Sequence, residues 1–185
     1  MLYCRSCDKC QINNEPTTLP YGRSLTLPNP DEVYESQAID FAGPFNKSDG
    51  YTSIMVIMDR FTSYPHLIPL KDAATSEQIF QKLNSTILDV HGLPLSIVLD
   101  QDSRFTSKFW SQMMKSLGIQ VWMATQYHNQ TNGQVERRIC TLKQLIRNFV
   151  NLRQNNWSGT LPAIAAAMNC TPHESLAIFA IPCPI

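Results

Sequence analysis

The stretch HGLPLSIVLDQDSRFTSKFW, residues 91–110, contains a strand, an aspartate and the start of a helix in close succession. Leu95–Leu99 is a short apolar run suited to a buried strand, and it delivers Asp100 at its carboxyl end. Apolar residues at helical spacing then predict a helix from about Thr106, and Ile119–Met123 predicts the next strand. The apolar face of this helix consists of Phe109, Trp110, Met113 and Leu117. Strands that alternate with helices indicate an α/β domain.

Upstream of this stretch, three further strands are predicted without a helix between them, which suggests an antiparallel meander. They are Gln37–Phe41, Thr52–Met58 and Tyr64–Leu70. Asp40 lies near the end of the first strand, just before a Gly-Pro pair that stops it. Thr75 and Gln78 form a capping box that starts a helix, and Gly92 ends it.

Downstream, a polar segment from Thr125 to Gly133 precedes a long helix, and Trp157–Met168 forms a last helix. The core stripe expected on the long helix is Ile139, Leu142, Ile146, Phe149 and Val150. The predicted element order is therefore βββαβαβ followed by helices.

The composition allows one principal domain, because 185 residues with 43% hydrophobic content can bury one sizeable core. No run is long and apolar enough for a membrane span, and the N-terminus lacks the basic, apolar and small-residue pattern of a signal peptide, so a soluble, intracellular protein is expected.

The net charge is zero, but the charges are distributed unevenly along the chain. Residues 1–102 hold 7 of the 15 basic and 13 of the 15 acidic side chains, which leaves 8 basic and 2 acidic ones for the remainder. Five basic residues and no acid lie between Arg137 and Arg153. This asymmetry indicates a polyanion-binding surface, although a solvated helix face remains the alternative.

Three carboxylates, Asp40, Asp100 and Glu136, lie at or near the ends of two strands and in the first turns of a helix. Two-metal phosphoryl chemistry needs several carboxylates that converge on two cations, and such hard oxygen ligands suit Mg²⁺ or Mn²⁺. Each residue alone is more simply interpreted as a cap. Together they are more specific, because 35 residues separate Asp100 from Glu136.

The words around these carboxylates resemble the integrases of gypsy-like long-terminal-repeat retrotransposons and their retroviral relatives. They are AIDFAGPF (38–45), MDRF (58–61), the stretch 91–110 and QYHNQTNGQVERR (126–138), within a match from about Tyr3 to Pro172. The resemblance implies a ribonuclease H-like core, a five-stranded mixed sheet flanked by helices, in agreement with the element order above.

The resemblance also implies a reaction. Asp40, Asp100 and Glu136 occupy the family's catalytic, metal-ligand positions, which hold two Mg²⁺ or Mn²⁺ ions. The family uses water to trim the 3′ ends of element DNA and then directs the new 3′ hydroxyls at target DNA. The implied partners are element-end DNA, target DNA and further copies of the chain, in the nucleus or an element particle.

DNA contacts are implied on the Glu136 helix and on the loop before it. Glu136, Cys140, Lys143 and Arg147 share one helical stripe turned away from the apolar stripe. Lys143 matches a position that contacts element ends, and Arg137 and Arg147 are expected to take nearby phosphates.

The loop Tyr127–Gly133 resembles a mobile family loop, which places Tyr127, Gln130 and Asn132 near DNA. Asn129 and Asn132 stand where the commoner family word has Pro and Asp, so the loop geometry is expected to differ. Asp59 is a possible fourth acid, but its place before Arg60 favours a surface ion pair or a turn, and we leave it out of the catalytic set.

Cys7 and Cys10 resemble the second half of a His-His-Cys-Cys zinc site, but no histidine lies upstream to complete it. Cys4 adds a third thiol, and Asn14 stands where an iron-sulfur run needs a fourth cysteine. The expected organisation is a truncated zinc module (1–15), a linker (16–32), the catalytic core (33–175) and a tail (176–185), with Zn²⁺ bound only in a longer chain.

The favoured interpretation is therefore a fragment of a retrotransposon integrase. An alternative is a non-catalytic relic or domesticated DNA-binding protein with the same fold. A third, a cut-and-paste transposase or a ribonuclease H-type nuclease, shares the metals but fits the quoted words less well.

Overall fold

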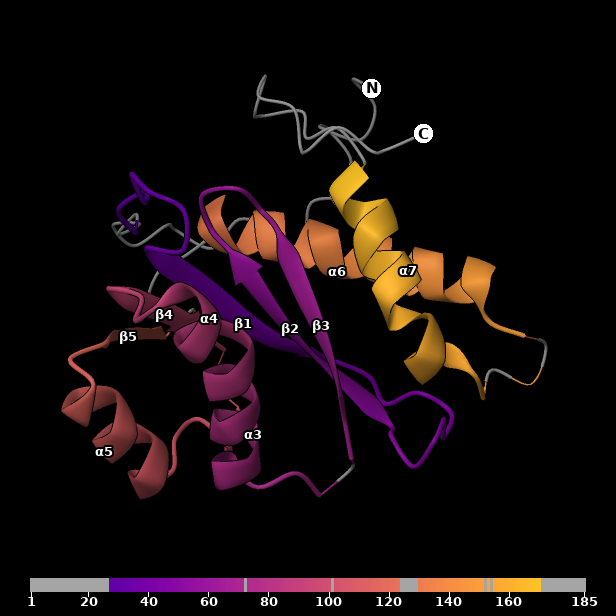
Figure 1. The fold of residues 1–185 in the computed structure, drawn as a ribbon, viewed down its shortest axis with the longest axis horizontal. Coiled ribbons are helices and arrows are strands. Elements are labelled where there is room, and N and C mark those ends of the chain that lie inside the picture. The colour runs from indigo at the N-terminus through magenta and orange to yellow at the C-terminus, as the bar shows by residue number, and fades with distance from the viewer. Residues whose placement is uncertain are drawn as a thin grey trace, which may run out of the picture.

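The computed structural model describes residues 27–71, 73–100, 102–123, 130–151, 153 and 155–170 (Figure 1). For residues 130–139 and 170 it describes the backbone alone. The predicted zinc-module residues Cys7 and Cys10 and the loop residue Tyr127 lie outside the described part of the chain.

Five strands form one mixed sheet in the order β3-β2-β1-β4-β5. The strands are β1 (Ser36–Ala42), β2 (Ser53–Asp59), β3 (Pro65–Leu70), β4 (Ser96–Leu99) and β5 (Gln120–Met123). The first three pair antiparallel, as the meander predicted, and β4 pairs parallel with both β1 and β5. The predicted five-stranded mixed sheet is confirmed.

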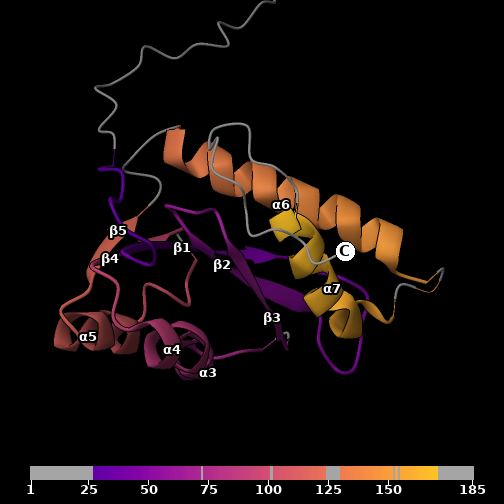
Figure 2. The ribbon, with the colours of Figure 1, turned by 45° about the horizontal axis from the view of Figure 1, so that its top comes forward.

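One face of the sheet is covered by a bent helical stretch and by α5 (Lys108–Ser116) (Figure 2). The helical stretch runs through α3 (Ser76–Leu83), a π-helical turn η1 (Asn84–Leu88) and α4 (Asp89–His91). The capping box of Thr75 and Gln78 is present, and Gly92 follows α4 with φ 89°. The local signals for this helix are therefore confirmed at both ends.

The other face is covered by α6 (Gln130–Phe149) and α7 (Trp157–Cys170), which lie on the opposite side of the sheet from α3 and α5 (Figure 2). The predicted loop up to Gly133 was too long, because α6 already begins at Gln130. A glycine inside a helix costs only about 1 kcal/mol, so Gly133 does not end the helical conformation. None of the described helices combines the length and apolar character that a membrane crossing needs.

Buried side chains form one cluster on each face of the sheet. In β1, Ala38 and Ala42 pack toward α6 and α7, whereas Ile39 packs toward α3 and α5. This follows from the strand geometry, since successive side chains point to opposite faces. The central sheet is therefore buried on both sides, and its strand ends are the places where polar side chains emerge.

Two residues depart from their expected environments. Phe149, expected in the core stripe of the long helix, is 45% exposed, whereas Leu142 and Ile146 of that stripe are buried. Leu27, from the segment expected to be a linker, is 5% exposed and packs in the cluster beneath α6 and α7. Packed residues therefore begin at least as early as Leu27, before the predicted start of the core at Val33.

Candidate active site

Asp40, two residues before the end of β1, and Asp100, directly after β4, occupy equivalent places on two neighbouring strands. The parallel pairing of β1 with β4 aligns Ile39 with Leu99, and each aspartate is the next residue along its chain. Neighbouring strands lie about 4.8 Å apart, so the two carboxyl groups emerge side by side at one edge of the sheet. The structure thus brings together two of the three predicted carboxylates, although 60 positions separate them in the sequence.

Both aspartates belong to the sheet face that α6 covers. Asp40 alternates with Ala38 and Ala42, which pack in the α6 cluster. Leu99 packs in the opposite cluster, so an extended continuation of β4 turns Asp100 to the same side as Asp40. Asp40 is half-buried and Asp100 is exposed, which makes this edge accessible from solvent.

The backbone fixes the orientation of the Asp40 carboxylate. Its Oδ1 accepts a hydrogen bond of 2.6 Å from the backbone N–H of Phe41. Such a bond restricts the rotation of the carboxylate.

Glu136, the third predicted carboxylate, lies in α6, the helix that covers the face to which Asp40 belongs. Its side chain is outside the described part, as are those of Gln130, Asn132 and Arg137. Among the side chains that the structure describes, no three His, Cys, Asp or Glu residues form a group able to hold a metal ion. The fold therefore places the helix of the third carboxylate above the pair, without describing how its side chain lies.

The exposed stripe expected on α6 is present in the part with described side chains. Cys140, Lys143 and Arg147 are exposed, while Leu142 and Ile146 pack against the sheet. The two cations therefore lie on the solvent side of the helix that carries Glu136.

The turn after Asp100 is held by a pair that the sequence interpretation did not single out. The Arg104 guanidinium donates two hydrogen bonds to the Asp102 carboxylate, from Nε at 2.8 Å and from Nη2 at 2.6 Å, and it lies 3.6 Å from the centre of the Phe41 ring. These bonds lower the pKa of Asp102. Because Phe41 directly follows Asp40, Arg104 ties the loop of one aspartate to the strand of the other. The spacing Asp-x-Arg was the only sequence signal for this contact.

Asp59 lies outside this site. It is fully buried and accepts hydrogen bonds from the backbone N–H of Tyr34, the Gln37 side chain, and both the backbone N–H and the hydroxyl of Thr62. Its strand partner is Gln37, about 10 Å along β1 from Asp40 at roughly 3.3 Å per residue. The expected surface ion pair with Arg60 was wrong and the turn was right, because Asp59 accepts hydrogen bonds from the turn that it starts.

Comparison with known proteins identifies the family to which this chain belongs. Residues 30–129 match the family model of the integrase core domain. The chain belongs to the integrase core domain family.

The relatives of this integrase core are longer proteins of mobile elements. It is 28% identical to the transposon Tf2-3 and Tf2-4 polyproteins of Schizosaccharomyces pombe over 173 residues, which is 94% of this chain. The chain spans about 13% of the length of these relatives.

Solved integrase structures share the fold. The simian T-cell lymphotropic virus intasome in complex with PP2A regulatory subunit B56 gamma superposes with a TM-score of 0.64 at 20% identity, over 95% of this chain and 61% of the other. The HTLV-2 integrase catalytic core domain in complex with magnesium, in its trimeric form, gives 0.59 at 19% identity, over 80% and 93%. The integrase core described here therefore has the ribonuclease H-like fold that its sequence predicted.

Proposed function

We propose that this integrase core trims the 3′ ends of element DNA and joins them to target DNA with Asp40, Asp100 and Glu136 as its catalytic carboxylates. The observation that carries the proposal is the register of β1 and β4, which sets Asp40 beside Asp100 on the face under the Glu136 helix.

The aspartate pair fits a divalent cation chemically. Two carboxylates about one strand spacing apart repel each other, and a shared cation relieves that repulsion. Their oxygens are the hard ligands that Mg²⁺ and Mn²⁺ prefer, and the exposure of Asp100 admits a hydrated ion. A bound cation would supply Lewis-acid stabilisation of the charge that builds up on the attacked phosphate.

The protein's own groups supply orientation and phosphate binding. The Phe41 N–H sets the rotation of the Asp40 carboxylate, and the Arg104–Asp102 pair holds the loop after Asp100. Lys143 and Arg147, with Arg137, neutralise phosphates along α6 and so fix the DNA in register with the carboxylates.

The solved relatives support two further parts of the proposal. The HTLV-2 catalytic core domain was solved in complex with magnesium, in trimeric and dimeric forms. We infer by likeness that this chain uses Mg²⁺ or Mn²⁺, two ions for the full site, and that it acts as a homo-oligomer.

The remaining assignments stay proposals of the same kind. Gln130 and Asn132, in the first turn of α6, and Tyr127, which precedes them in the sequence, contact DNA. Cys7 and Cys10 bind Zn²⁺ only when a longer chain supplies two more ligands. The place of action is the nucleus or an element particle.

The test uses a branched DNA that mimics an integration product, with Mn²⁺ or Mg²⁺. The wild-type chain should release the joined strand, and Asp40→Asn, Asp100→Asn and Glu136→Gln should each lower the rate by about 100-fold or more, since each removes part of several kcal/mol of charge stabilisation. Glu77→Gln is the matched control, because Glu77 is an exposed carboxylate on α3, across the sheet. Strand release that persists in Glu136→Gln would contradict the assignment of the three carboxylates.

A further inference from the structure

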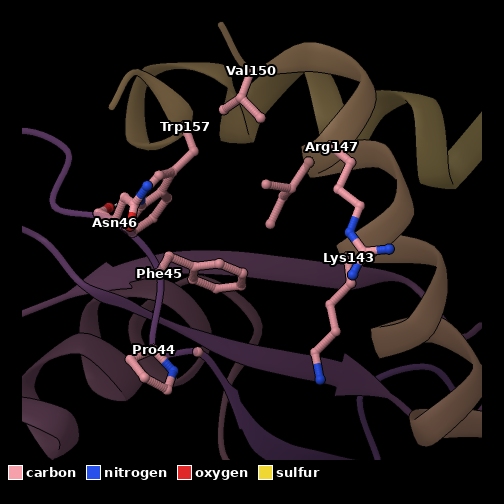
Figure 3. Close-up of a pocket in the computed structure, with 9 residues that line it drawn as sticks. Pro44, Phe45, Asn46, Lys143, Arg147, Val150 and Trp157 are labelled. Atoms are coloured by element: carbon pink, nitrogen blue, oxygen red, sulfur yellow. The ribbon is translucent and has the colours of Figure 1, made fainter. Parts of the chain in front are cut away.

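A pocket of about 390 Å³ lies between the loop that follows β1 and the second half of α6 (Figure 3). The sequence did not predict this pocket. Its lining residues are Gly43, Pro44, Phe45, Asn46, Lys143, Ile146, Arg147, Val150 and Trp157. The pocket is therefore built from three segments that meet only in the folded protein.

One wall of the pocket is cationic. Lys143 and Arg147 are both exposed on α6, one helical turn apart. Within the described ranges neither forms an ion pair, and no carboxylate lines the pocket. Two cations that pair with none of the described carboxylates, at a concave site, favour an anionic ligand.

The opposite wall is aromatic. The Phe45 ring is half-buried and points from its loop into the space bordered by Lys143 and Arg147 (Figure 3). Behind it lies Trp157, 1% exposed, with ring centroids 5.5 Å apart. The Trp157 Nε1–H donates a 2.6 Å hydrogen bond to the Asn46 carbonyl, which holds the loop against α7. The Phe45 ring is therefore presented by a fixed loop.

The distance along α6 relates this pocket to the catalytic carboxylates. Lys143 and Arg147 lie seven and eleven residues beyond Glu136, which is about 10 and 16 Å along the helix axis. One strand of duplex DNA has a phosphate roughly every 3.4 Å along its axis. A strand that follows α6 thus reaches the pocket about three to five nucleotides from the phosphate at the carboxylates.

We propose that this pocket holds one unpaired nucleotide of a DNA strand, with its flanking phosphates at Lys143 and Arg147 and its base on the Phe45 ring. A base inside a duplex is already stacked on both faces, whereas an unpaired base has a face free to lie against an aromatic ring inside a pocket. The proposal rests on the proposed function, because it assigns the position of a strand whose reacting phosphate lies at the carboxylates.

The test measures binding of the full chain to a labelled 20-base-pair DNA, either blunt or with three unpaired thymidines at the 5′ or 3′ end, over a series of NaCl concentrations. The wild type should bind at least one tailed duplex more tightly than the blunt one. Phe45→Leu keeps apolar volume but removes the ring, and should reduce that preference roughly tenfold, whereas Phe45→Tyr should retain it. For the tailed duplex, Arg147→Met should make the slope of log binding constant against log salt concentration less steep by about 0.7, because one single-strand phosphate contact is lost.

The matched control is Lys115→Met, an exposed cation near the end of α5 on the opposite face of the sheet, which should retain both the preference and the slope. Equal affinity for blunt and tailed duplexes in the wild type, or no measurable binding of the tailed ones, overturns the pocket assignment. A preference unaffected by Phe45→Leu overturns it as well.

Strand release from the blunt branched DNA, measured in parallel, separates this proposal from the proposed function. A chain that releases strands but shows no tail preference overturns the pocket alone. A chain that prefers tails but keeps its activity in Glu136→Gln overturns the triad and supports the pocket.

Discussion

Asp59 is a carboxylate whose environment depends on residues that are distant in the sequence. Its neighbour Arg60 is visible in the sequence, and it favoured a turn or a surface ion pair. Its hydrogen-bond donors Tyr34 and Gln37 precede it by 25 and 22 residues, and only strand pairing brings them to it. The burial of this carboxylate therefore could not be predicted from the local sequence.

Asp59→Ala should lower the free energy of unfolding by about 3 kcal/mol, because it leaves the Tyr34 and Thr62 N–H groups and the Gln37 amide without an acceptor. Urea denaturation measures this. Asp89→Ala, at an exposed carboxylate on α4, should stay within about 0.5 kcal/mol of wild type. Equal effects of the two substitutions would show that the Asp59 hydrogen bonds contribute nothing to stability.

His66, which interacts electrostatically with Asp59, makes the unfolding free energy depend on pH. Burial lowers its pKa, His91 lowers it further, and Asp59 opposes them. The folded state therefore disfavours the protonated ring, so stability is full above the unfolded-state pKa of about 6.5 and falls as the pH drops below it. The loss of unfolding free energy between pH 7.5 and pH 5.5 should be smaller in His66→Gln than in wild type. An identical loss in both proteins would contradict this.

At the scale of elements, the features that depend on interactions within a few residues were predicted correctly. The capping box at Thr75, the glycine after α4 and the five strand positions depend on local backbone chemistry. The π-helical turn Asn84–Leu88 and the early start of α6 were not predicted, since periodicity changes little over one extra residue or one helical turn.

The apolar stripe of α6 was predicted correctly for Leu142 and Ile146 but not for Phe149. Ile146 packs against the sheet, whereas Phe149, three residues on, is 45% exposed. Ile146→Ala should therefore cost about 2–4 kcal/mol of unfolding free energy, and Phe149→Ser less than about 1 kcal/mol. Chemical denaturation of the two variants checks this. A larger loss for Phe149→Ser would mean that this ring is covered in solution.

At the scale of the whole molecule, a single sheet separates two cores, with Trp157 in one and Trp110 in the other. Because both cores share the same strands, we expect one cooperative unfolding transition. Far-UV circular dichroism and tryptophan fluorescence should give the same midpoint in wild type, Trp110→Phe and Trp157→Phe when each protein is compared with itself. Separate midpoints would indicate that the two faces unfold independently.

The candidate site was predictable from the sequence only in part. The residue types and the spacing of Asp100 and Glu136 identified it through a family resemblance, and the alignment of Asp40 with Asp100 followed from pairing that no local pattern specifies. The Phe45–Trp157 pocket joins residues 112 positions apart, and no motif in the sequence links the two. Such long-range placement is a property of the fold, and sequence periodicity does not contain it.

The most direct test of the central claim, that Asp40 and Asp100 jointly hold a divalent cation, is a Mn²⁺ titration of the full chain followed by electron paramagnetic resonance of the free ion. Wild type and the Glu77→Gln control should remove free Mn²⁺ from solution with the same affinity, while Asp40→Asn and Asp100→Asn should each weaken binding by at least about tenfold, because each replaces a charged hard oxygen ligand. This loss would also exclude a relic that keeps the fold without the metal site. Unchanged Mn²⁺ binding in both aspartate variants, or no binding in wild type, would contradict the account.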